Sequence, residues 1–271
     1  MSFLFTPVYT PAQSPPGQEI SGEKLQELFR QGVMAAQKQE WLTALGYFEE
    51  VRRGAPLNPE LLFNLALTEE ALPGRELRSL AWFKAYLVLD PDGPDRKLHD
   101  PKSIEETCQS LEKGVRQTIS LLLRQAVQIA GRFSNAQDRN RGLIRVAEAQ
   151  AETGNFREAE ETAYQIESKF REPIYQKIAL LRTESKEPSK NNSQAIPPSK
   201  GQASVSETQK KKAEAFIQFI DTRLNRPYFL NPEKYFQFLS TQSTSRERFE
   251  GLMEAATKIN EALVEYKKLD Q

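Results

Sequence analysis

The feature that most constrains the fold of this chain is an internal repeat of 35 residues. Small, aromatic and proline positions recur at this spacing, so that Ala44, Phe48, Val51 and Pro56 correspond to Ser79, Phe83, Tyr86 and Pro91. A third copy follows 115 residues after the first, where Ala147, Ala159, Ala163 and Ile166 correspond to Gly32, Ala44, Phe48 and Val51. A repeat of about 20 to 50 residues is typical of architectures in which each unit buries its apolar face against its neighbours. The repeat therefore predicts a stack of similar units.

Each unit is predicted to be a pair of helices. Apolar residues recur every three or four positions, which is the spacing of one helix face, as in Leu25, Leu28, Phe29 and then Leu45, Phe48, Val51. The alternating β-branched runs that are typical of strands are absent from the sequence. Helix starts are marked by Asn58-Pro59 and Asn231-Pro232, and by the capping-box pairs Ser103 and Glu106, Ser206 and Gln209, and Thr244 and Glu247. The predicted fold class is all α.

The first copy has a small residue in its first helix, an aromatic residue where the second helix begins, and a closing proline: Gly32, Trp41, Ala44, Phe48 and Pro56. The second copy repeats this pattern with Ala66, Ser79, Phe83 and Pro91. At these positions the chain resembles the tetratricopeptide repeat family. The resemblance implies an α-solenoid of antiparallel helix pairs, in which small residues let helices approach and aromatic rings fill the space between them. The third copy departs from the family, since it has Ala163 in the aromatic position and ends at Arg171.

The predicted domain organisation has four parts. Residues 1–20 are expected to be a disordered N-terminal tail, and residues 21–183 a TPR-like helical-repeat domain. Residues 184–212 are rich in Ser, Lys, Gln, Asn and Pro, and are expected to be a flexible linker because they cannot bury enough apolar surface. Residues 213–271 are expected to form a smaller C-terminal helical module, which either stands alone or packs on the repeats. The long apolar stripe from Ile104 to Ile129 is expected to bridge or cap the stack.

The residue inventory argues against catalysis. The chain has one cysteine, Cys108, and one histidine, His99, which leaves too few ligands for a typical zinc site and too few partners for a histidine-based triad. Cys108 falls on an apolar helix face, where a free thiol usually packs as a small hydrophobic group. No phosphate-binding glycine loop is present. We therefore expect a protein without catalytic activity, metal or cofactor.

A protein or peptide partner is expected, because the first helix of each repeat lines the concave side of such a solenoid. On the family register that side carries Phe29, Val33 and Gln37, then Phe63, Asn64 and Leu67, then Arg141, Arg145 and Glu148. These nine residues are the predicted partner-binding site, and an apolar or helical segment is the expected occupant. The alternative for Phe29 and Phe63 is plain core packing.

Asn64, Arg141 and Arg145 also match part of the carboxylate clamp by which some family members hold a peptide C-terminus. Phe29 and Val33 replace the basic and amide residues of that clamp, so the match is incomplete.

Two other functions stay open. Arg132, Arg139, Arg141 and Arg145 are a candidate surface for nucleic acid or phosphate, but the 37 basic and 37 acidic residues of the chain balance, and nucleic-acid affinity scales with clustered positive charge. The sequence contains no run of about 20 apolar residues, the length that a membrane-spanning helix needs. A cytoplasmic location is expected. The alternative is an accessory subunit of a secreted or membrane-tethered complex, and a secreted or periplasmic location is the alternative expectation if residues precede Met1.

Overall fold

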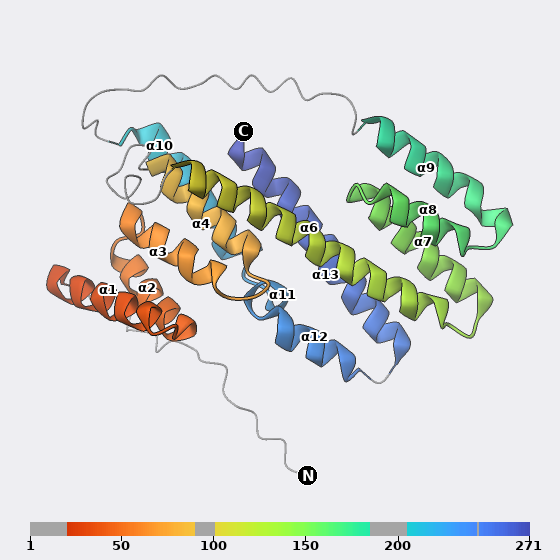
Figure 1. Ribbon diagram of the computed structural model, residues 1–271, viewed down its shortest axis with the longest axis horizontal. Helices are drawn as coiled ribbons and strands as arrows, with labels where there is room; N and C mark the ends of the chain where they lie inside the picture. Colours follow the sequence, from red (N-terminus) through yellow and green to blue (C-terminus); the bar gives the residue numbers. More distant parts are fainter. Residues whose placement is uncertain (1–20, 90–100, 185–204, 243) are drawn as a thin grey trace, which may run out of the picture.

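A computed structural model describes residues 21–89, 101–184, 205–242 and 244–271. In these ranges every regular element is a helix and no strand occurs (Figure 1). The all-α prediction is therefore confirmed. None of the helices in these ranges is long and apolar enough to cross a membrane. The expected N-terminal tail, His99 and most of the expected linker lie outside the described residues.

The first four helices form two consecutive pairs. They are α1 (Gly22–Gln37), α2 (Trp41–Gly54), α3 (Pro59–Glu70) and α4 (Glu76–Leu89), and each pair packs along its length while α2 also packs on α3. Gly32 permits the first pair to close, because a Cβ atom there would lie 2.6 Å from the ring of Phe48. In the second pair Ser79 donates its hydroxyl to the carbonyl oxygen of Ala66 over 2.9 Å. Small residues thus set both close approaches.

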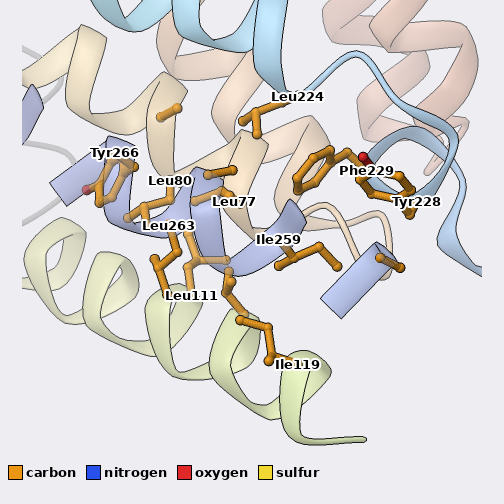
Figure 2. Close-up of a cluster of buried hydrophobic side chains, with 14 of the residues drawn as sticks. Leu77, Leu80, Leu111, Ile119, Leu224, Tyr228, Phe229, Ile259, Leu263 and Tyr266 are labelled. Atoms are coloured by element: carbon orange, nitrogen blue, oxygen red, sulfur yellow. The ribbon is translucent and has the colours of Figure 1, made fainter. Parts of the chain in front are cut away.

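The two longest helices run side by side through the middle of the molecule (Figure 1). They are α6 (Pro101–Gly131) and α13 (Ser245–Asp270). They are antiparallel, because Lys267 near the end of α13 pairs with Glu112 in the first half of α6 at 2.6 Å, whereas Phe249 packs edge-on against Phe133 just beyond α6. Figure 2 shows the core between α4, α6 and α13, with Leu77, Leu80, Leu111, Ile119, Ile259 and Leu263 among its side chains.

A second group of helices lies at the far end of α6 from α1 (Figure 1). It comprises α7 (Ala136–Glu152), α8 (Phe156–Tyr164), the short 3-10 helix η1 (Ser168–Phe170) and α9 (Arg171–Glu184). Helix α7 packs on α6 and pairs with α8, and α9 packs on both α7 and α8. The chain between α7 and α8 turns at Gly154, whose φ of +80° is strained for any residue with a side chain.

The last helices return to the first group. They are α10 (Glu207–Arg223), α11 (Pro227–Leu230), α12 (Pro232–Ser240) and α13. Helix α10 packs on α4, and Arg52 of α2 pairs with Asp221 of α10 at 2.9 Å. Helix α10 therefore packs on the first group of helices, α1–α4. Helix α10 begins at Glu207, inside the range expected to be linker.

Most of the predicted helix starts are observed. Asn58 and Asn231 cap their helices ahead of proline, and complete capping boxes form at Ser206 and Thr244. The prediction at Ser103 is wrong, because α6 already begins at Pro101 and Ser103 lies inside it.

A buried ionic cluster joins α3, α4 and α10. The carboxylate of Glu69 is fully buried and accepts from Arg75 at 2.9 Å and from Arg78 at 2.8 Å. Arg78 also donates to the backbone oxygen of Leu224 over 3.2 Å. Every buried charge in this cluster has a partner, as a low-dielectric interior requires.

Candidate functional site

The predicted site residues on α1 belong partly to the core. Phe29 packs against Phe48, with ring centroids 5.7 Å apart, and Val33 is half-buried beside the same core. Gln37 is exposed at the end of α1. The core-packing alternative therefore describes Phe29.

The predicted residues on α3 are similarly divided. Phe63 is buried at 6% exposure between Phe83 and Tyr86, so its side chain is not available to a partner. Asn64 is half-buried and donates to the backbone oxygen of Glu60, one turn earlier in its own helix. Leu67 is exposed. Of the six predicted residues on α1 and α3, only Gln37 and Leu67 are therefore exposed to a partner.

The predicted residues on α7 lie elsewhere. Arg141 is exposed, Arg145 pairs with Glu250 of α13, and Glu148 lies 3.5 Å from Lys177 of α9. Helix α7 is at the opposite end of α6 from α1 and α3 (Figure 1). The structure therefore does not bring the predicted residues together on one concave face.

Arg141 and Arg145 instead line a small cleft between α7 and α13, here called the α7–α13 cleft. Its volume is about 140 Å³. The lining comes from the turn before α7, from α7 itself and from the first turns of α13: Phe133, Ser134, Asn135, Asp138, Arg141, Gly142, Arg145, Arg246, Phe249 and Glu250. Three arginines and two carboxylates face this small volume.

Arg145 contacts both Glu250 and Phe249 in this cleft. Its Nη1 and Nη2 atoms donate to the two carboxylate oxygens of Glu250, over 2.7 and 3.0 Å. The guanidinium also lies over the ring of Phe249, 5.3 Å from its centroid, and Phe249 packs edge-on against Phe133. A stacked, bidentate guanidinium is the geometry by which arginine recognises planar or tetrahedral anions.

A larger cleft opens on the other side of the start of α13, here called the α12–α13 groove. Its volume is about 920 Å³. One wall is aromatic and apolar, with Tyr228, Tyr235, Phe238 and Leu239, and the other is the polar face of α13, with Arg246, Glu247, Glu250, Glu254 and Lys258. Phe238 is 59% exposed, which is unusual for a phenylalanine.

The aromatic wall is fixed in position. Tyr228 and Tyr235 pack with centroids 5.5 Å apart, and the Tyr235 hydroxyl donates to the backbone oxygen of Gly251 over 3.2 Å. Burial, reinforced by the nearby Glu254 carboxylate, raises the pKa of both tyrosines. Both phenols therefore stay protonated at neutral pH, and the wall is an uncharged surface with hydrogen-bonding edges.

The two clefts adjoin, because Arg246 and Glu250 line both. In the groove three basic residues, Arg226, Arg246 and Lys258, balance three acidic ones, Glu247, Glu250 and Glu254. In the α7–α13 cleft the arginines outnumber the carboxylates by one. The combined surface therefore has a neutral, aromatic part and a smaller, basic part.

The described ranges contain one free cysteine and no cluster of metal-ligating side chains. No three side chains of His, Cys, Asp or Glu lie close enough there to hold a metal ion. Cys108 is buried in α6, and burial raises its pKa to about 11, so the thiol is a poor nucleophile at neutral pH.

Sequence reasoning missed the α13 half of both clefts. Arg246, Phe249 and Glu250 follow the capping box at Thr244, which does predict that they share the first turns of a helix. Nothing local connects them with Arg145, which is 105 residues earlier than Glu250. The available signal was the pair of long apolar stripes in α6 and α13, which need each other for burial.

The chain matches no protein-family model, and comparisons with curated proteins and with solved structures find no match either.

Proposed function

We propose that this protein is a non-catalytic helical scaffold of tetratricopeptide type, which binds a segment of a partner protein in the α12–α13 groove. The observation that carries the proposal is the groove itself, with an aromatic wall facing a polar one. Binding sites are typically concave and apolar, with a few fixed polar groups, and have volumes of roughly 300 to 1,000 Å³. The groove has these properties.

The helix pairing supports the scaffold part of the proposal. Helices α1 and α2, α3 and α4, and α7 and α8 each pack as neighbours across a short turn, which favours antiparallel pairs. The approach of Gly32 to Phe48 is the contact that the tetratricopeptide pattern implies.

The chemistry of the groove favours one kind of partner. Phe238 is exposed and Tyr235 is half-buried, and such aromatic side chains, which have few rotatable bonds, are among those that dominate protein interfaces. The balanced charges of the groove suit a segment with polar groups of both signs. We therefore propose a segment whose apolar side chains contact the aromatic wall while its polar side faces α13.

Photocrosslinking tests this location. A photoreactive phenylalanine analogue is placed at position 238, and in a matched protein at position 180. Phe238 and Leu180 are exposed to nearly the same extent, 59% and 58%, but Leu180 lies on α9, away from the groove. In native cells we expect a defined partner to crosslink from position 238 and not from position 180.

The captured partner is then purified and its affinity measured. We expect Phe238→Ala to weaken binding about tenfold, as loss of an interface anchor does, and Leu180→Ala to leave it unchanged. Equal crosslinking from both positions, or full affinity of the Phe238→Ala protein, contradicts the proposed groove. Both side chains are exposed, so both variants should fold, which circular dichroism verifies.

A further inference from the structure

Three arginines line the α7–α13 cleft, and they come from helices that are far apart in the sequence. Arg141 and Arg145 come from α7, and Arg246 comes from the first turn of α13. Arg141 and Arg246 form no ion pair and no side-chain hydrogen bond with any residue that the structure describes. The cleft therefore has two unpaired arginines beside one that pairs with Glu250.

The Glu250 carboxylate binds the Arg145 guanidinium in the way that an anionic ligand would. It accepts both guanidinium edges, yet the side chains of Arg145 and Glu250 are 42% and 50% exposed. An ion pair this exposed contributes little stability, so exchanging Glu250 for another anion costs little. The stacking of Arg145 on Phe249 keeps the guanidinium in place during such an exchange.

The size and charge of the α7–α13 cleft favour a single small anion over the phosphate backbone of a nucleic acid. A volume of about 140 Å³ is roughly ten times what one water molecule needs, which is enough for one phosphate group with some water. Asp138 and Glu250 lie in the cleft, and Glu247 and Glu254 lie in the adjoining groove. These carboxylates repel the successive phosphates of a nucleic acid.

We propose that the α7–α13 cleft binds a single phosphate group carried by the partner segment, an inference that rests on the proposed function. Arg141 and Arg246 hold the phosphate oxygens from two sides, and Arg145 joins them as Glu250 swings away. Arginine clusters recognise phosphorylated side chains in this way. The arginines carry the site, because the side chain of Asn135 already accepts from the backbone N–H groups of Gln137 and Asp138 at the start of α7.

The first test needs no partner. The full chain is titrated with inorganic phosphate at constant ionic strength, and binding is followed by NMR at the backbone amides of Ser134 to Asp138. We expect saturable shifts with phosphate and much weaker ones with acetate. Shifts with acetate that saturate as readily as those with phosphate, or no shifts with phosphate, overturn the proposal.

Four variants then separate a built site from general electrostatics. Arg141→Gln and Arg246→Gln each remove one proposed contact, and we expect each to weaken phosphate binding about tenfold, as loss of a charge-assisted hydrogen bond does. Glu250→Gln removes the competing carboxylate, and we expect tighter binding. Arg132→Gln is the matched control, since Arg132 is exposed next to Phe133 but does not line the cleft. Equal weakening by Arg132→Gln overturns the proposal.

The experiments distinguish this proposal from the one on which it rests. Crosslinking from position 238 does not require Arg141, and phosphate titration does not require a partner. Once the partner is purified, we expect phosphatase treatment to weaken its binding to the wild-type chain, and to weaken its binding to the Arg141→Gln protein by a smaller factor. If single-stranded RNA binds more tightly than inorganic phosphate at equal phosphate concentration, and Arg132→Gln weakens that binding as well, a nucleic-acid surface replaces the proposed site.

Discussion

Arg78 of α4 donates a hydrogen bond to the backbone oxygen of Leu224, 146 residues later in the chain, at the end of α10. The end of a helix carries unsatisfied carbonyl groups and a partial negative charge. Glu69 alone must otherwise balance two buried guanidinium groups, those of Arg75 and Arg78. The end of α10 therefore supplies the second acceptor that this cluster needs, and the cluster in turn holds α10 against α4.

Glu69→Gln should destabilise the protein strongly. The change leaves two buried arginines without a carboxylate, and breaking a buried ionic network in this way costs about 3–5 kcal/mol. Urea unfolding followed by circular dichroism measures the loss. Glu70→Gln is the matched control, because Glu70 is exposed and forms no part of the cluster, and we expect it to stay within about 0.5 kcal/mol of the wild type. Similar stabilities of the two variants would refute the structural role of the cluster.

Gly32→Ala should destabilise the first helix pair. The new Cβ atom would lie 2.6 Å from the Phe48 ring, and overpacking of this kind costs about 1–3 kcal/mol. Gly131→Ala serves for comparison, since Gly131 ends α6 with nothing within 4 Å of an added Cβ. We expect that control to be neutral or slightly stabilising in thermal unfolding. A Gly32→Ala protein as stable as the wild type contradicts the close approach.

Cys108 should be inert in the folded protein. Burial raises its pKa from 9.0 to about 11, so at pH 8 the thiolate fraction falls roughly 100-fold, and the buried side chain also excludes reagent. Titration with a chromogenic disulfide at pH 8 should detect almost no reaction until denaturant is added. Rapid modification of the native protein would place Cys108 at an accessible position.

The contact between α6 and α13 should weaken in acid. Burial alone would raise the pKa of Glu112, but hydrogen bonds from Lys267 and Arg116 outweigh it and leave that pKa below its ordinary value of 4.5. A carboxyl whose pKa is lowered by folding stabilises the protein above its unfolded pKa, and this contribution is lost as the pH falls through the folded pKa. We therefore expect Glu112→Gln to lower the melting temperature at pH 7, and the difference from the wild type to shrink below about pH 4. A difference that is constant from pH 7 to pH 3 contradicts the ion pair.

Local signals explain what was predicted correctly. The helical spacing and the caps at Asn58, Ser206, Asn231 and Thr244 depend on residues within one turn, so the sequence reports them directly. Ser103 failed because capping-box spacing also occurs by chance inside a helix.

Long-range packing explains what was missed. A phenylalanine at position 63 fits the repeat pattern equally well in a groove or in the core, so the sequence does not distinguish the two. In the structure Phe63 is buried because Phe83 and Tyr86 cover it. The meeting of Arg145 with Glu250 requires α13 to lie along α6, and apolar stripes of similar length do not state which partner they choose. The α7–α13 cleft is a product of that choice.

Helix α6, which has 31 residues, sets the distance between two groups of helices. At 1.5 Å per residue it is about 46 Å long, and it carries the α1–α4 helices near one end and α7–α9 near the other. Helix α13 packs along α6 and reinforces this separation. An extended peptide needs about 14 residues to reach from one group to the other, so shorter segments must choose one end. Any segment that contacts both groups at once must therefore contain at least about 14 residues, whatever its chemistry.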